Sequence, residues 1–279
     1  MNDQLKYSLH KIIDLAIEED IKSGDITSQA IFSDTDESDA YVIAKENGIF
    51  CGGFVAEEVY NKIDSSLSLI IEVKEGAHIK KGDVVLRIKG KTSSILMGER
   101  ITLNFLQRMC GIATKTGVIT KLIDETDIEI LDTRKTLPGF RYLDKYAVIC
   151  GDGTNHRIGL YDMVMIKDNH IKAAGSITNA VKKIRKSYGE KFKIEVETTD
   201  LNEVKEAVDQ NIDIIMLDNM NKETMIQAIN IINKKSKIEI SGNMDKDKID
   251  KIKDLDVDYI SIGSLTHSVN AFDLSMKFN

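Results

Sequence analysis

Short apolar segments alternate with amphipathic helical segments from about Gly111 onward, and this alternation limits the possible folds more than any other feature of the chain. Strands that are each followed by a helix form parallel βαβ units, so this part is predicted to be α/β with a parallel sheet. The later units recur about every 20 to 30 residues, which is close to the length of one strand with its helix. The predicted strands are residues 128–132, 163–167, 193–197, 213–218, 237–241 and 258–262.

The chain before Gly111 follows a different pattern. Residues 5–17 place apolar side chains at helical spacing, which predicts an amphipathic helix near the N-terminus. Between about Tyr41 and Lys91, short strand-like runs are interrupted by glycine. We therefore expect an α+β region first and an α/β region second.

Local signals predict where helices of the second region begin and end. Three helices have suitable N-cap residues in Ser176, Asp200 and Asn221. Gly189 is expected to end the first of these helices. The chain has a single proline, Pro138, just after residues 133–136. Its fixed φ would stiffen the turn that leaves this segment.

The composition is that of a globular chain and excludes several classes of protein. Of the 279 residues, 42% are hydrophobic and 30% are charged, which excludes disorder and collagen-like structure. The net charge of −7 gives no overall basic field for nucleic acid or an anionic membrane. The three cysteines form neither a C-x-x-C pair nor a disulfide framework, and no apolar run has the length of a signal peptide or membrane span. We expect a cytoplasmic protein.

Polar or charged residues follow each predicted strand of the second region. In α/β barrels the carboxyl ends of the strands meet at one mouth, where the chemistry takes place. A charged residue after one strand is often only the first solvated position of a loop. The same pattern after six strands favours a shared pocket. These strand ends are residues 132–135, 167–170, 195–197, 218–219, 241–243 and 263–264.

The predicted pocket would be locally cationic although the whole chain is acidic. Its basic residues would be Arg134, Lys135, His156, Arg157 and Lys167, and its acidic residues Glu197 and Asp218. Arginine binds planar carboxylates and phosphates through two hydrogen bonds, and lysine adds a point charge, so the pocket is predicted to bind a polyanion. The two carboxylates could take ribose hydroxyls or hold Mg²⁺ through water. Turns at residues 241–243 and 262–264 could offer N–H groups to a phosphate, although each turn alone is a weak signal.

Residues 98–109 predict a helix with an apolar stripe on one face. Arg100, Asn104 and Arg108 line another face at a spacing of four residues. Such a polar column is most often a solvated surface, so the pattern alone assigns no function to Arg100.

Ordered motifs along nearly the whole chain resemble one enzyme family. They are EDIKSGDITS at residues 19–28, RITLN at 100–104, DTRKTLPG at 132–139, NHR at 155–157, IKDNH at 166–170, EVE at 195–197, LDN at 217–219, SG at 241–242 and GSLTHS at 263–268. Together they resemble the quinolinate phosphoribosyltransferase family, also called nicotinate-nucleotide pyrophosphorylase (carboxylating). The number of motifs and their order make a chance match implausible.

The resemblance implies an architecture and an assembly. It implies an N-terminal α/β sandwich domain, residues 1–110, followed by an incomplete parallel α/β barrel, residues 111–266, with the tail 267–279 packed on the first domain. It also implies a homodimer, or a hexamer built from dimers. In that assembly Arg100 of one subunit would act at the barrel mouth of its neighbour.

The resemblance also implies a reaction and roles for single residues. The 5-phosphoribosyl group of phosphoribosyl pyrophosphate would be transferred to quinolinate with loss of CO₂, in the biosynthesis of NAD. The catalytic residues implied are Lys135, Lys167, Glu197 and Asp218, with Mg²⁺ near the two carboxylates. The substrate-binding residues implied are Arg100, Thr133, Arg134, His156, Arg157, Ser241, Gly242, Asn243, Ile262, Gly263, Ser264 and His267.

Three alternatives stay open on the residues alone. A molybdenum-transport-associated homologue or a nicotinate phosphoribosyltransferase would share the barrel, but the unbroken TRK and NHR segments favour a dicarboxylate substrate. Residues 73–85 have the rhythm of a lipoyl or biotinyl carrier, but they lack a lysine on a tight hairpin. Zinc chemistry is not indicated, because the histidines are scattered and no Cys/His motif is present.

Two residues depart from the pattern of the family. Asn243 stands where the family often has a second glycine, and Asp152 interrupts a glycine run before Asn155. If the turn requires positive φ at Asn243, asparagine is the residue that tolerates it best after glycine. We therefore expect the turn to form.

Overall fold

The computed structural model describes residues 3–279, which divide into two compact units. The N-terminal unit contains the described residues up to Val118 together with residues 136–152 and 265–279. The parallel-sheet unit contains residues 119–135 and 153–264. The domain boundary after residue 110 stays a prediction.

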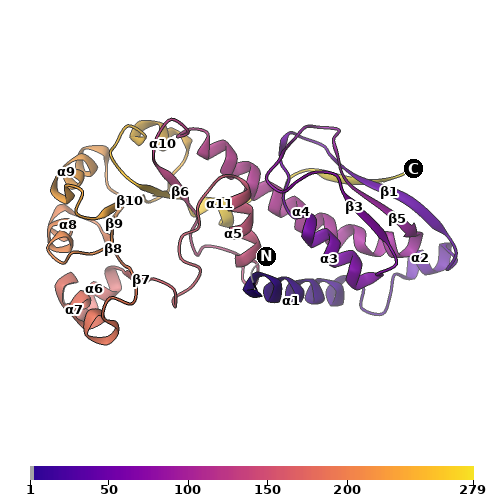
Figure 1. The fold of residues 1–279 in the computed structure, drawn as a ribbon, viewed down its shortest axis with the longest axis horizontal. Helices are drawn as coiled ribbons and strands as arrows, with labels where there is room; N and C mark the ends of the chain where they lie inside the picture. Colours follow the sequence, from indigo (N-terminus) through magenta and orange to yellow (C-terminus); the bar gives the residue numbers. More distant parts are fainter. Residues whose placement is uncertain (1–2) are drawn as a thin grey trace. The chain divides into compact units, whose positions relative to one another are not determined.

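A four-stranded antiparallel sheet forms the centre of the N-terminal unit. Its strands, in spatial order, are β12 (Leu274–Phe278), β1 (Glu37–Ala44), β5 (Val84–Lys91) and β3 (Ser68–Ile71). The last strand of the chain pairs with β1 from Ala40↔Phe278 to Ala44↔Leu274, so the C-terminal residues complete this sheet (Figure 1). Two short strands, β2 (Gly48–Ile49) and β4 (His78–Ile79), form a separate pair.

Helices accompany this sheet within the same unit. They are α1 (Asp3–Asp20), α2 (Ile26–Ile31), α3 (Gly53–Ile63), α4 (Thr92–Thr120) and α5 (Arg141–Cys150). The predicted N-terminal amphipathic helix is confirmed as α1, which buries Leu5, Leu9, Ile12 and Ile13 and contacts α3 and α5.

The polar column of the predicted 98–109 helix lies on α4, and it is not solvated along its whole length. Arg100 and Asn104 are exposed. Arg108 instead donates from Nε and Nη2 to the two carboxylate oxygens of Asp144 on α5, at 2.8 and 2.7 Å, and to the carbonyl of Thr266 at 3.0 Å. The expectation of a solvated face is therefore wrong for Arg108, because its partner lies far along the sequence.

Asp144 has no exposed surface, and burial raises the pKa of its carboxyl even though the Arg108 guanidinium acts in the opposite direction. The guanidinium also lies 5.4 Å from the centre of the Phe140 ring, which itself stacks on Phe105 at 5.7 Å. This buried ion pair fastens α4 to α5.

A six-stranded parallel sheet forms the second unit. Its spatial order is β6 (Glu129–Leu131), β11 (Tyr259–Ser261), β10 (Lys237–Ser241), β9 (Ile214–Asp218), β8 (Ile194–Thr198) and β7 (Val164–Ile166). All six predicted strands are confirmed, with ends that differ by at most one residue. The edges β6 and β7 do not pair within the described residues, as expected for an incomplete barrel.

Helices alternate with these strands, and the predicted caps are confirmed. The helices are α6 (Asp168–Ala174), α7 (Ile177–Tyr188), α8 (Leu201–Val208), α9 (Lys222–Ile232), α10 (Lys246–Ile252) and α11 (Ser264–His267). The side chains of Ser176, Asp200 and Asn221 accept hydrogen bonds from the first turns of α7, α8 and α9. Gly189 ends α7 with a φ of 60°. Figure 1 shows α8 and α9 on the outer side of the strands.

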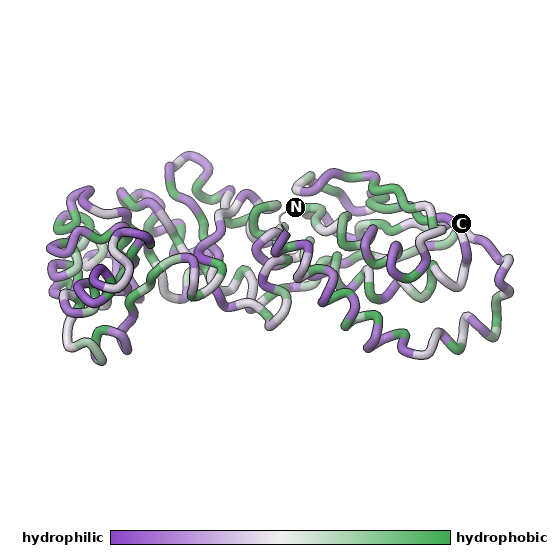
Figure 2. Tube along the Cα trace, turned by 60° about the horizontal axis from the view of Figure 1, so that its bottom comes forward, coloured by the Kyte–Doolittle hydropathy of each residue, from purple (hydrophilic) through white to green (hydrophobic). Residues whose placement is uncertain are grey.

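Hydropathy changes over short stretches along the helices and strands, as Figure 2 shows. The 29-residue helix α4 carries Glu99, Arg100 and Arg108 along its length. No helix among residues 3–279 is both long and apolar enough to cross a membrane.

We predict that Arg108→Met lowers the free energy of unfolding by about 3–5 kcal/mol, because it leaves the buried Asp144 carboxylate without its cation. Urea unfolding at pH 7 measures this change. Lys253→Met is the control, because its partner Asp250 is exposed and such pairs contribute at most about 1 kcal/mol. A loss below about 1 kcal/mol for Arg108→Met would contradict the structural role of the pair.

Candidate active site

The carboxyl ends of the six parallel strands hold most of the predicted site residues. Because neighbouring strands are parallel and in register, residues that are far apart in sequence meet at this edge, as Ser241 pairs with Asp218 in the register of β10 and β9. Residues 133–135 follow β6, Lys167 follows β7, Glu197 lies in β8, and residues 262–264 follow β11. Gly242 and Asn243 follow β10, and His156 and Arg157 come before β7 in the sequence. Arg100 on α4 and His267 on α11 belong to the N-terminal unit.

An ion pair connects the ends of β7 and β8. Lys167 Nζ lies 2.5 Å from Glu197 Oε2, and the side chains are 40% and 16% exposed, so both can meet a ligand. The imidazole Nδ1 of His170 accepts from the backbone N–H of Lys167 at 3.0 Å, which fixes the first turn of α6. The lysine is therefore held at the edge of the sheet.

His156 lies between two glutamates of the sheet. Its Nε2 is 2.9 Å from Glu195 Oε2 and 3.5 Å from Glu239 Oε2, and both glutamate side chains are completely buried. Its Nδ1 accepts from the backbone N–H of Arg157 at 2.7 Å. With a side chain only 7% exposed, the imidazole faces the interior of the sheet.

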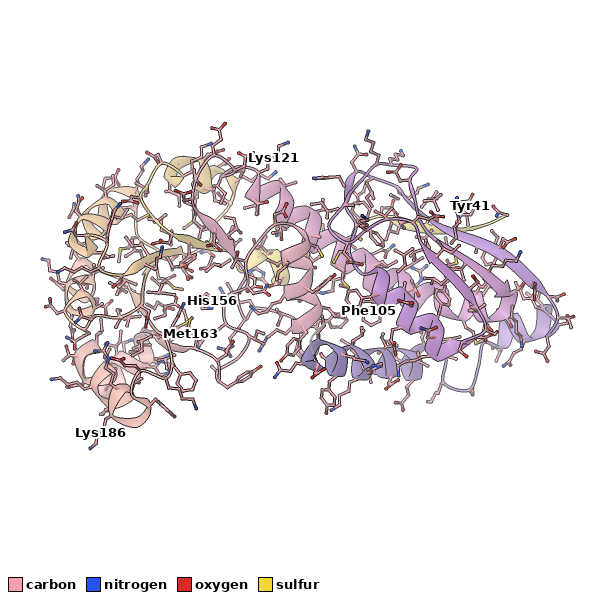
Figure 3. The ribbon with its side chains drawn as sticks, viewed as in Figure 1. Tyr41, Phe105, Lys121, His156, Met163 and Lys186 are labelled. Carbon is pink, nitrogen blue, oxygen red and sulfur yellow. The ribbon has the colours of Figure 1, made fainter. Side chains whose placement is uncertain are left out.

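A carboxylate at the end of β6 holds the segment that carries His156. Buried Asp132 accepts from the backbone N–H of His156 at 3.0 Å and from the side chain of Asn155 at 2.6 Å. Further along, Arg157 Nη1 donates to the carbonyl of Met163 at 3.1 Å. Figure 3 labels His156 and Met163 on this segment.

Charges around this cluster shift several pKa values. Burial raises the pKa of Glu195, an effect that His156 partly offsets. Burial by itself lowers the pKa of His156, but the hydrogen bonds and charges of Glu195 and Glu239 outweigh it and raise the pKa to about 9. The hydrogen bond that Nδ1 accepts from the Arg157 N–H acts in the opposite direction, because it requires an unprotonated nitrogen.

Burial lowers the pKa of Arg157, and the positive charge of Arg134 lowers it further. The two guanidinium groups therefore repel each other when no anion is bound. An anion placed between them would remove this repulsion, so the pair is suited to bind a carboxylate or phosphate.

The turn after β10 adopts left-handed backbone conformations at two consecutive residues. Gly242 has a φ of 111° and Asn243 a φ of 47°. A Cβ at Gly242 would lie 2.4 Å from the side-chain oxygen of Asn219, so the turn requires glycine there. Asparagine takes the second left-handed position, as expected if the turn required positive φ. Asp152, the other departure, also has a positive φ, of 62°.

Sequence reasoning missed Glu195 and Glu239 as parts of the cluster. Both are charged residues between two buried apolar neighbours of a central parallel strand, where an unbroken apolar run is usual. An isolated carboxylate at such a position was the available signal. Its partner His156 could not be identified from the sequence, because it comes from a segment without regular structure.

Comparison with known proteins covers nearly the whole chain. Residues 25–110 match the model of the quinolinate phosphoribosyl transferase N-terminal domain, and residues 112–277 match that of its C-terminal domain. The probable nicotinate-nucleotide pyrophosphorylase [carboxylating] of Bacillus subtilis is 42% identical over 96% of this chain and 92% of its own length. The chloroplastic enzyme of Arabidopsis thaliana is 42% identical over 98% and 83%.

Solved structures agree with these matches. NadC from Streptococcus pyogenes superimposes with a TM-score of 0.94 at 39% identity, covering 98% of this chain and 97% of that one. The nicotinate-nucleotide pyrophosphorylase from Francisella tularensis gives 0.93 at 39% identity, covering 98% and 96%. With both domains matched and relatives above 40% identity along almost the full length, this chain belongs to the quinolinate phosphoribosyltransferase family.

Proposed function

We propose that this chain transfers the 5-phosphoribosyl group of phosphoribosyl pyrophosphate to the ring nitrogen of quinolinate. The products are nicotinate mononucleotide, pyrophosphate and CO₂, as in de novo NAD biosynthesis. Membership of the family supports the reaction. The structural observation that supports the reaction is that basic and acidic side chains lie together at one edge of the parallel sheet, as in the Lys167–Glu197 pair.

Binding a dicarboxylate requires several cations in one place. We assign the carboxylates of quinolinate to Arg134, Arg157 and Lys167, with Thr133 beside them. The mutual repulsion of Arg134 and Arg157 favours an anion between them. His156 supports these binding residues from within the sheet, because its Nε2 is directed to Glu195 and Glu239.

The phosphoribosyl substrate would occupy the neighbouring strand ends. We assign its 5-phosphate to the turns after β10 and β11, through the backbone N–H groups of residues 241–243 and 262–264, with His267 as a further contact. The positive φ values of Gly242 and Asn243 make a tight turn at this strand end, where backbone N–H groups could face the phosphate. Lys135 would face the pyrophosphate.

The donor set at the ends of β8 and β9 fits a magnesium ion that arrives with the pyrophosphate. Glu197 and Asp218 supply carboxylate oxygens, the ligands that Mg²⁺ prefers, from adjacent strands. When bound, Mg²⁺ would stabilise the departing diphosphate. The same two carboxylates would hold the ribose hydroxyls and stabilise positive charge that develops on the sugar.

Fixed charges account for the chemical steps. As the bond from the anomeric carbon to the pyrophosphate oxygen breaks, the sugar becomes cation-like, and the pyridine nitrogen donates its electron pair to that carbon. The new pyridinium can accept the electrons left when the adjacent carboxylate departs as CO₂, and a proton then replaces CO₂ on the ring. No protein nucleophile is needed, so catalysis rests on positioning and preorganised charge.

We also propose a homodimer, or a hexamer of dimers, in which Arg100 of one subunit completes the site of its neighbour. The exposed position of Arg100 on α4 is compatible with such a role. The cytoplasm is the proposed location, since all three cysteines are free.

We predict that Arg134→Ala and Lys167→Ala each lower kcat/KM for quinolinate by at least ~100-fold, because each removes a cation that holds and positions a carboxylate of this substrate. Release of CO₂ from labelled quinolinate measures turnover. Lys172→Ala, on the exposed side of α6, is the control and should behave as wild type. Nicotinate should give no product with the wild-type chain. Faster turnover of nicotinate than of quinolinate would support the nicotinate phosphoribosyltransferase alternative instead.

Mixing two inactive variants tests the shared site. Arg100→Ala subunits mixed with Lys167→Ala subunits should recover up to about one quarter of wild-type activity, because random dimers leave one site in four intact. Native mass spectrometry confirms that mixed dimers form. Mixed dimers without activity would contradict the role of Arg100 in trans.

The paired glutamates predict a pH dependence of stability. A histidine whose pKa is about 9 in the folded chain and about 6.5 unfolded stabilises the fold fully below pH 6.5 and loses this contribution as the pH rises through 9. The stability of the wild type relative to His156→Gln should therefore fall over this range in urea unfolding. Nitrogen NMR of the imidazole measures the pKa directly. A value at or below 6.5 would mean that the Arg157 N–H contact dominates.

A further inference from the structure

All three cysteines of the chain converge in the N-terminal unit, although they are far apart in sequence. Cys51 precedes α3, Cys110 lies within α4, and Cys150 is the last residue of α5. Cys51 donates its backbone N–H to Cys110 Sγ at 3.2 Å, and Cys110 Sγ donates to the carbonyl of Cys51 at 3.3 Å. Three separate elements thus bring thiols to one place.

A carboxylate completes this group. Sγ of Cys51, Sγ of Cys150 and a carboxylate oxygen of Glu75 all lie within 4.8 Å of one another, and Cys150 Sγ is 3.8 Å from Glu75 Oε2. In a tetrahedral zinc site, bonds of about 2.3 Å to sulfur and about 2.0 Å to oxygen place neighbouring ligand atoms roughly 3.5–3.8 Å apart. The distance from Cys150 to Glu75 matches this spacing, and the other two pairs lie within 4.8 Å.

The backbone holds the carboxylate in a defined orientation. Glu75 accepts from the N–H of Gly52 at 2.9 Å and from the N–H of Gly53 at 2.7 Å. Gly52 has a φ of 109°, and a Cβ at Gly53 would lie 3.2 Å from Glu75 Oε1, so the glycine pair lets the carboxylate approach. Metal-binding carboxylates are commonly held in this way by hydrogen bonds from a second layer of groups.

The chemistry of the three side chains suits a divalent cation. Two thiolates and one carboxylate carry three negative charges, which a divalent ion would largely neutralise. Cys51 is buried, whereas Cys150 and Glu75 are half-buried and give access from solvent.

We propose that Cys51, Cys150 and Glu75 form a binding site for one thiophilic divalent cation of the zinc class. Two sulfurs and one oxygen leave the fourth position of a tetrahedron to water. Sulfur ligands select zinc or cadmium over magnesium, which prefers oxygen. The site uses none of the residues assigned to phosphoribosyl transfer, so it does not depend on the proposed function.

Cadmium titration of the reduced, chelator-treated full chain tests this inference. Cadmium–thiolate bonds absorb in the ultraviolet, and we expect this absorption to saturate at one ion per chain and to disappear on competition with zinc. One proton or more should be released for each ion bound. Saturating zinc should raise the unfolding midpoint by about 5 °C or more.

Matched variants locate the ion. Cys51→Ser and Cys150→Ser should abolish the thiolate absorption, and Glu75→Gln should weaken zinc at least ~10-fold. Two control variants should bind cadmium and zinc as the wild type does. Cys110→Ala removes the one thiol outside the group, and Glu197→Gln with Asp218→Asn disables the proposed magnesium carboxylates. Circular dichroism and cooperative unfolding show that each variant is folded.

Three results would overturn the inference. The first is that the reduced chain shows no saturable cadmium–thiolate absorption. The second is that the double variant Cys51→Ser with Cys150→Ser retains this absorption. The third is that the chain binds no cadmium and loses two titratable thiols on treatment with hydrogen peroxide. The last result would identify the cysteines as a redox pair that forms a disulfide while peroxide is reduced to water.

Discussion

The parallel-sheet unit depends on the neutralisation of charge inside its own sheet. Glu195 and Glu239 occupy central strand positions with no exposed surface, where an unpaired carboxylate costs several kcal/mol, about 3–5 when its partner is removed. His156 is the side chain whose Nε2 contacts both carboxylates. The segment that carries this histidine must therefore return to the sheet for the strands to be stable, although it has no helix or strand of its own around residue 156.

This requirement of the fold also places Arg157, a proposed substrate-binding residue. Once His156 is seated, the next residue, Arg157, is fixed at the same edge, with its guanidinium donating to Met163. Asp132 holds the same backbone from the end of β6. Little reorganisation is then needed when an anion arrives, which is the condition under which fixed charges stabilise a transition state most. The buried carboxylates thus also fix the backbone that carries Arg157.

The sequence predicted local structure better than long-range partners. All six parallel strands and the caps at Ser176, Asp200 and Asn221 were predictable, because strand polarity and capping depend on neighbours along the chain. The gathering of strand ends followed from the rule for α/β barrels. Arg108 was misjudged, because the identity of its partner Asp144 depends on how two helices pack. The roles of individual site residues remain expectations that rest on resemblance to the family.

The cysteines show the same limit for metal-binding motifs. A motif such as C-x-x-C identifies only a site whose ligands share one local segment, and Cys51, Glu75 and Cys150 come from three. Their spacing excludes a zinc finger but says nothing about a site assembled by packing. Net charge is uninformative about the proposed anion site for the same reason. The sum of −7 averages over residues that the fold separates, so it does not describe the charge at any one edge of the sheet. In both cases the chemistry is decided by which residues the fold brings together.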